Sequence, residues 1–148
     1  SDLMKKFKIL VPLDGTERSM HSLNWLKKFY DKDAVSITLI NVMETLLTDE
    51  VLNPMKPVMV STPTGFDYLT KDSNLVLDKG MKELEGYDAY KISTLGNAAD
   101  EILNTSEKDS FDLIIMTKCS KSGLYRLIGS VTSKVVRNAK IPITIIPD

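Results

Sequence analysis

The sequence has little of the chemistry that marks a secreted, metal-binding or membrane protein. Its 148 residues contain one cysteine, Cys119, and one histidine, His21. A lone cysteine cannot form an internal disulfide, which fits a reducing compartment, and a lone histidine excludes a metal site built on several imidazoles. No apolar run approaches the roughly 18 residues of a membrane span, and the N-terminal residues lack the apolar core of a signal peptide. We therefore expect a cytoplasmic protein without membrane contact.

Signatures of catalysis and of nucleic-acid binding are also missing. There is no G-x4-G-K-S/T phosphate loop, no G-x-G-x-x-G after the first apolar run, and no G-x-S-x-G nucleophile turn. The formal net charge is -1 and the basic residues are scattered, so no patch for nucleic acid is visible. We predict that the chain is not an enzyme and does not bind nucleic acid or a metal.

What is present is the composition of one soluble domain spanning 1–148, with 43% hydrophobic and 26% charged residues. Short apolar, β-branched runs alternate with segments in which apolar residues recur at helical spacing. Asp14-Gly15 breaks the first run, and Thr16 is placed to cap the helix that follows. The predicted strands are 7–13, 34–42, 89–95, 111–116 and 141–146. The predicted helices are 19–30, 68–85, 98–103 and 130–138.

The segment 43–65 is predicted to be irregular, because Pro54, Pro57, Pro63 and Gly65 interrupt it. A loop of this length inside a compact domain is typical of a lid or a binding loop.

Strands that alternate with helices predict a parallel sheet covered by helices on both faces. In such sheets ligands bind beyond the carboxyl ends of the strands, where the strand order reverses. This rule directs attention to 13–15, to 42–43 and to 116–130.

Two segments resemble the universal stress protein family. The first is ILVPLDGTE at 9–17. The second begins with DLIIM at 112–116 and continues through IGSVTSKV at 128–135 to IPI at 141–143, and the element GNAADEIL at 96–103 agrees with the family as well. Each motif is weak alone, but their order and spacing make the resemblance specific over nearly the whole chain.

The resemblance implies a five-stranded parallel sheet in the order 3-2-1-4-5, sandwiched by helices in an adenine nucleotide alpha-hydrolase-like fold. It also implies a homodimer. If the last strand lies at an edge, pairing with its twin satisfies the exposed backbone groups. The predicted dimer interface consists of Ile143, Thr144, Ile145 and Ile146.

One branch of the family binds ATP through the pattern G-x2-G-x9-G-S/T, in which glycines let backbone N–H groups approach phosphate. Here the pattern is broken. Counting back from Gly129-Ser130 puts Met116 and Cys119 at the first two glycine positions, and counting forward from the strand end puts Thr117 and Ser120 there. Only Gly129-Ser130 is intact in either register.

Two hypotheses stay open. The first is a dimeric stress-response module with weak or absent ATP binding; the second is a switch that binds ATP with magnesium. Asp14 either lies near the adenine and ribose or only caps its turn, and Gly129-Ser130 either anchors phosphate or only caps a helix. A flavodoxin-like carrier is a poorer match because the turn after the first strand is acidic. If nucleotide binding is retained, the resemblance and the carboxyl-end rule place it at Pro12, Leu13, Asp14, Val42, Met116, Thr117, Lys118, Ser120, Gly129, Ser130, Val131 and Thr132.

Overall fold

The computed structural model describes residues 5–44, 63–118 and 128–147, and of 63–67 only the backbone. In chain order its elements are β1 (Phe7–Pro12), α1 (Glu17–Phe29), β2 (Val35–Glu44), α4 (Pro63–Glu83), β3 (Asp88–Gly96), α5 (Ala98–Lys108), β4 (Leu113–Thr117), α6 (Ser130–Asn138) and β5 (Ile143–Ile146).

The sheet has five strands in the order β3-β2-β1-β4-β5, and every neighbouring pair is parallel. β1 is therefore the central strand, with Val11 opposite Leu39 of β2 and Leu10 opposite Ile114 of β4. This confirms the predicted fold class and strand order. β3 and β5 are the two edges of the sheet.

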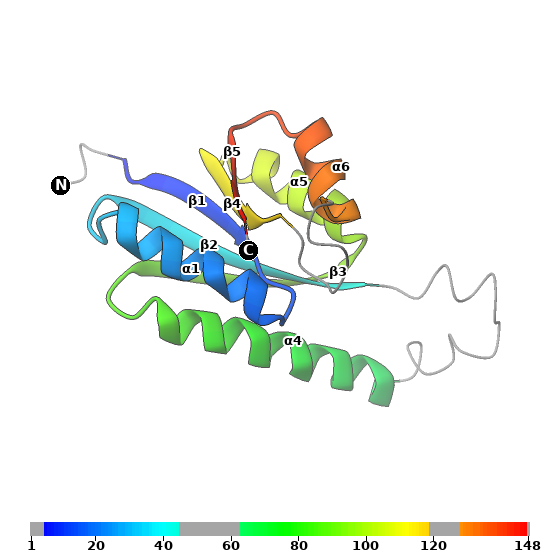
Figure 1. Cartoon of the computed structure of the whole chain (residues 1–148). Coiled ribbons are helices and arrows are strands. Elements are labelled where there is room, and N and C mark those ends of the chain that lie inside the picture. Colours follow the sequence, from blue (N-terminus) through cyan, green and yellow to red (C-terminus); the bar gives the residue numbers. More distant parts are fainter. Residues whose placement is uncertain (1–4, 45–62, 119–127, 148) are drawn as a thin grey trace.

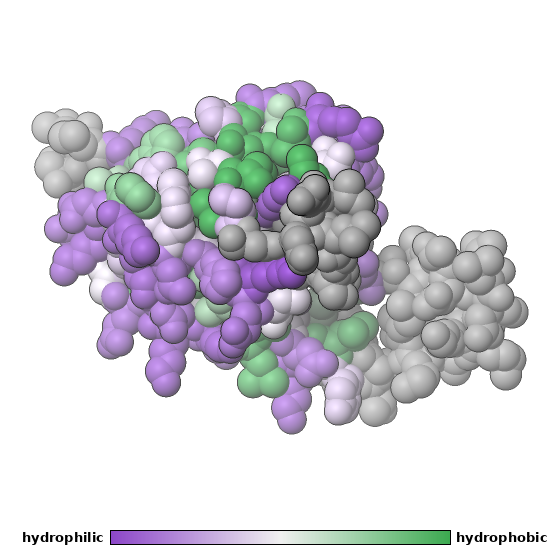
Figure 2. Space-filling model, in the orientation of Figure 1, coloured by the Kyte–Doolittle hydropathy of each residue, from purple (hydrophilic) through white to green (hydrophobic). Residues whose placement is uncertain are grey.

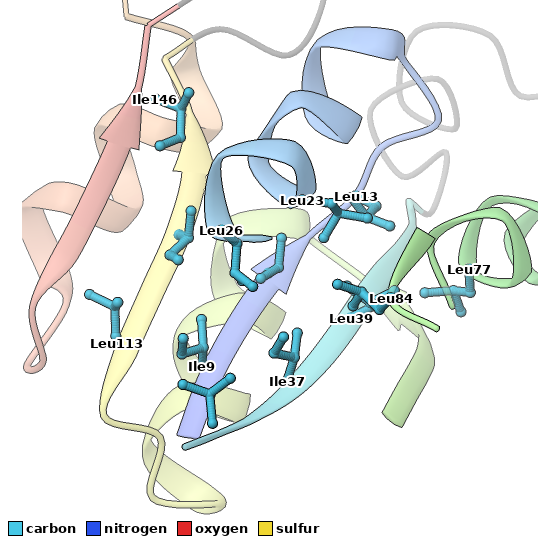
Figure 3. Close-up of a cluster of buried hydrophobic side chains, with 13 residues drawn as sticks. Ile9, Leu13, Leu23, Leu26, Ile37, Leu39, Leu77, Leu84, Leu113 and Ile146 are labelled. Carbon is cyan, nitrogen blue, oxygen red and sulfur yellow. The ribbon is translucent and has the colours of Figure 1, made fainter. Parts of the chain in front are cut away.

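Helices cover both faces of the sheet (Figure 1), and each face has its own apolar core. α1 and α4 cover one face, where Ile9 and Val11 of β1 are buried against Leu23 and Leu26 of α1 (Figure 3). α5 and α6 cover the other face, where Leu10 is buried among side chains that include Ile102 and Val135. Successive residues of β1 point to opposite faces, so a strand buried on both sides reads as a continuous apolar run.

The prediction of irregular backbone through Gly65 is wrong at both ends of that segment. β2 extends to Glu44, and α4 begins at Pro63 rather than at Tyr68. Proline is tolerated as the first residue of a helix, because its missing N–H would have no intrahelical acceptor there. Residues 45–62, which contain Pro54 and Pro57, lie outside the described part of the chain.

Within the described ranges, no helix combines the length and the apolar character needed to cross a membrane. The same residues contain no group of three acidic, histidine or cysteine side chains arranged to hold a metal ion.

Candidate functional site

A cavity of about 410 Å³ opens at the carboxyl ends of the central strands. β1 lies between β2 and β4 there, at the point where the strand order reverses, which is the usual ligand position in open parallel sheets. Its volume is within the range typical of small-molecule pockets. The cavity is lined by Pro12, Leu13, Asp14, Ser19, Ile40, Asn41, Val42, Glu44, Ala98, Ile102, Met116, Thr117, Gly129, Ser130, Val131 and Thr132.

The turn after β1 fixes the carboxylate of Asp14. Asp14 Oδ1 accepts hydrogen bonds from the Thr16 backbone N–H at 2.9 Å and from the Thr16 hydroxyl at 2.6 Å. Thr16 is the N-cap of α1, and its hydroxyl oxygen accepts from the Ser19 N–H at 3.2 Å. Asp14 Oδ2 is buried and has no hydrogen-bond partner among the described residues. One carboxylate oxygen is thus held by the turn, while the other has no partner among the described residues.

A buried side chain from β2 also contacts this turn. Asn41 is only 8% exposed, and its Nδ2 donates to the Leu13 carbonyl oxygen at 2.8 Å. The Leu13 N–H donates to the Ile40 carbonyl at 2.9 Å. The pairing between β1 and β2 therefore continues one residue beyond the end of β1.

The opposite wall of the cavity is the N-terminus of α6. Gly129 is its N-cap, with φ -61° and ψ 155°, and no side chain caps the helix. The first intrahelical bond is donated by Ser133 to the Gly129 carbonyl at 2.8 Å. The N–H groups of Ser130, Val131 and Thr132 precede it and have no intrahelical acceptor. The pair Gly129-Ser130 lies at the helix start: Gly129 occupies the cap position, and Ser130 is the first helical residue and makes no side-chain capping bond.

Two hydrogen bonds tie this helix start to the end of β4. The Thr132 hydroxyl donates to the Thr117 carbonyl at 3.0 Å, and both residues are buried. The Gly129 N–H donates to the Lys118 carbonyl at 3.1 Å. The helix start is therefore fixed against the sheet by residues on either side of 119–127, a segment that lies outside the described residues.

The structure brings most of the sequence-predicted site residues to this one cavity. Lys118 is the exception among those described: it follows β4, its N–H donates to the Ile146 carbonyl at 2.9 Å, and it does not line the cavity. Ser120 lies outside the described residues, as does Cys119. Two carboxylates, Asp14 and Glu44, line the cavity, and no lysine or arginine is among its described lining residues.

Sequence reasoning missed the remaining lining residues: Ser19, Ile40, Asn41, Glu44, Ala98 and Ile102. Asn41 carried a signal, because an amide in the otherwise apolar run 39–43 must find a buried hydrogen-bond partner. Ala98 and Ile102 follow Asn97, which caps α5 through a 3.0 Å bond to the Asp100 N–H. A helix over 98–103 was predicted, but its approach to the cavity was not.

Comparison with known proteins supports the family resemblance. The universal stress protein family model matches residues 7–147. The universal stress protein MJ0531 of Methanocaldococcus jannaschii is 31% identical over 147 residues, covering 94% of this chain and 81% of that protein. The universal stress protein YxiE of Bacillus subtilis is 27% identical over 150 residues, covering 94% of this chain and 97% of that one. The chain therefore belongs to the universal stress protein family.

Solved structures agree with this fold. The structure of the hypothetical protein MJ0577 superposes with a TM-score of 0.77 at 27% sequence identity, covering 97% of this chain and 96% of that one. The universal stress protein UspA from Lactobacillus plantarum gives a TM-score of 0.73 at 16% identity, covering 96% and 99%.

Proposed function

We propose that this chain is a dimeric stress-response module whose cavity binds an adenine nucleotide, with ATP bound weakly or not at all. The observation that carries the proposal is the pairing of two complementary walls in one cavity. One wall contains the Asp14 carboxylate, whose buried Oδ2 has no partner among the described residues, and the other contains the N-terminus of α6, which no side chain caps.

These walls fit the two ends of a nucleotide. A carboxylate oxygen accepts hydrogen bonds from hydroxyl or amino groups, which a nucleoside carries. The N-terminus of a helix favours anions, because its free N–H groups and the helix dipole both point at the ligand. Between the walls, Val42 and Ile40 give the cavity an apolar side against which a flat base can pack.

Structural relatives support an adenine nucleotide as the ligand. One is a universal stress protein in complex with cAMP, at a TM-score of 0.66 and 14% identity. Another is a universal stress protein family protein from Arabidopsis thaliana with AMP bound, at a TM-score of 0.67 and 15% identity. At these identities only the fold is shared, so the ligand is a proposal for the present chain.

Weak binding of ATP follows from the interrupted glycine pattern. Met116 or Thr117 stands at the first glycine position, and a side chain there prevents close approach of phosphate to the backbone. Each charge-assisted hydrogen bond that is lost costs about 1.5 to 3 kcal/mol, so two lost bonds lower the affinity by roughly two to four powers of ten. The alternative, an ATP-dependent switch, requires other groups to replace those contacts.

Calorimetry with AMP and with magnesium-ATP tests this proposal. The wild type should bind AMP, and it should bind magnesium-ATP no more tightly. Ser130→Glu should abolish binding, because it places a negative charge at the anion-binding helix start. Ser133→Glu is the matched control, since it adds the same charge to the same helix at a residue that does not line the cavity. Micromolar binding of magnesium-ATP, lost in Ser130→Glu only, would favour the switch instead.

Dimerisation through β5 is the second part of the proposal. β5 is an edge strand, and its side chains Ile143, Thr144 and Ile145 are only partly buried. Two further apolar residues are exposed: Val136 in α6 is 47% exposed, and Ile128, two residues before α6, is 51% exposed. Figure 2 shows apolar surface where Figure 1 places β5 and α6. Pairing with a second copy would cover this surface and satisfy the free strand edge.

A proline in β5 tests this interface only where the amide faces outward. The Pro142 carbonyl accepts a hydrogen bond from Ile114 of β4, and the Ile146 carbonyl accepts one from Lys118, just after β4. Because the backbone groups of alternate residues face the same neighbouring strand, those of Thr144 also face β4. The amide of Ile145 then faces the free edge. Ile145→Pro should shift sedimentation toward monomer, whereas the control Ile145→Ala keeps the amide and should shift it less. A wild type that sediments as a monomer at tens of micromolar, roughly the range where weak interfaces dissociate, would refute the dimer.

A further inference from the structure

The peptide group between Leu13 and Asp14 is held by side chains on both sides. Its carbonyl oxygen accepts from Asn41 Nδ2 at 2.8 Å, and its N–H donates to the Ser19 hydroxyl oxygen at 3.3 Å. The Ser19 hydroxyl in turn donates to the Thr16 carbonyl at 2.9 Å. Asn41 comes from β2 and Ser19 from the first turn of α1, so a strand distant in sequence and the adjoining helix together fix the orientation of one peptide plane.

That orientation limits where the Asp14 side chain lies. A fixed peptide plane sets the position of the Asp14 Cα and leaves rotation about its N–Cα bond as the backbone freedom that moves the side chain. The two hydrogen bonds from Thr16 to Oδ1 then restrict that rotation and the orientation of the carboxylate. Oδ2 is the remaining oxygen of this carboxylate; it is buried and has no hydrogen-bond partner among the described residues, and Asp14 lines the cavity.

We propose that Asn41 is a positioning residue for the ligand: it clamps the Leu13–Asp14 peptide so that the Asp14 carboxylate is held in place at the cavity wall before a ligand arrives. This proposal rests on the proposed nucleotide-binding function. Asn41 is proposed to act through Asp14, because one N–H of its Nδ2 is engaged by the Leu13 carbonyl and holds the peptide that carries Asp14. Preorganisation of this kind raises affinity by removing the cost of ordering the group on binding.

The geometry also explains why an amide occupies an apolar strand. Asn41 faces the same side of β2 as Ile37 and Leu39, both of which are fully buried in the apolar core. An apolar residue there would pack against these neighbours but would leave the Leu13 carbonyl without a buried donor. A leucine at position 41 has nearly the same shape as asparagine, so it removes the donor with little change in volume.

Asn41→Leu tests the proposal through a double-mutant cycle with Asp14→Ala. We expect Asn41→Leu to weaken AMP binding about tenfold, which corresponds to about 1.4 kcal/mol. In the Asp14→Ala background the same substitution should change the affinity less than about twofold, a twofold ratio being about 0.4 kcal/mol. Thr38→Val is the matched control, since it removes a buried polar group from the same strand away from the cavity lining and should leave AMP affinity unchanged. All variants are measured at a temperature where each is folded, so a loss of stability does not imitate a loss of affinity.

A second measurement does not depend on the ligand. Hydrogen exchange of the Asp14 and Thr16 amides should accelerate at least about tenfold in Asn41→Leu, while exchange in β4 stays unchanged apart from any global destabilisation. An unchanged rate at both amides would overturn the clamp, and so would an equal loss of AMP affinity with and without Asp14. If the wild type binds no AMP, the proposed function fails, and amide exchange alone then decides whether Asn41 holds the turn.

Discussion

Gly80 of α4 is closely packed against side chains of the core. A methyl group added there would lie 2.6 Å from Leu13 Cδ1 and 2.7 Å from Leu39 Cδ1, both shorter than normal carbon contacts. Leu13 and Leu39 are buried in the core beneath α4 and α1 (Figure 3). From the sequence alone, Gly80 only weakens a helical pattern. In the structure, it lets α4 approach Leu13, just after β1, and Leu39 of β2.

Two effects of Gly80→Ala oppose each other, and their magnitudes decide the sign. Alanine is favoured over glycine inside a helix by about 1 kcal/mol. Overpacking a well-packed core costs about 1 to 3 kcal/mol. Because both crowded methyl groups lie in the buried core, neither can turn toward solvent, so the packing cost should exceed the gain. We expect the free energy of unfolding in urea to fall, by up to about 2 kcal/mol.

A compensating substitution makes the reasoning testable in detail. Leu39→Val removes the crowded Cδ1, and alone it should cost about 1 kcal/mol. In the Gly80→Ala background that cost should vanish or reverse. Leu26→Val is the control, because Leu26 is fully buried in the same cluster but is not among the atoms near the added methyl group. Its effect should add to that of Gly80→Ala. An increase in stability for Gly80→Ala alone would refute the packing argument.

Three further substitutions test local features of the fold. Ser110→Gly should raise the free energy of unfolding by about 0.5 to 1 kcal/mol, since Ser110 has a φ of 55°, and no gain would show that the turn relaxes without strain. Thr16→Ala should lower it by about 1 kcal/mol through loss of the α1 cap, and an unchanged urea midpoint would contradict that role. A hydrogen bond from Tyr90 chiefly lowers the pKa of Asp88 below its ordinary value of 3.8, with Lys6 contributing. The stabilisation from the ionised Asp88 is therefore present above pH 3.8 and is lost as the pH falls through the lowered pKa of Asp88. Tyr90→Phe should raise the Asp88 pKa in an NMR titration, and an unchanged pKa would exclude the hydrogen bond between Tyr90 and Asp88.

Features encoded by neighbouring residues were predictable from the sequence. The apolar run at 7–13 indicated a strand buried on both faces, because every side chain of such a strand meets a helix layer. Asp14-Gly15-Thr16 marked the turn and the cap, since these residues act through bonds to their own neighbours. The alternation of strands and helices then left few topologies, and the family resemblance selected the order that the structure shows.

Contacts between distant residues were decided by the tertiary structure. Asn41 reaches the Leu13 carbonyl across 28 positions of sequence, and no local pattern states which buried carbonyl an amide will find. Gly80 appeared as a weak point of a helix, although its lack of a side chain is what allows α4 to pack on Leu13 and Leu39. Pro63 read as a helix breaker and proved to be a helix start. In each case the sequence determined the chemistry of the residue, and the packing of separate elements determined its partner, because partners are selected by proximity in space.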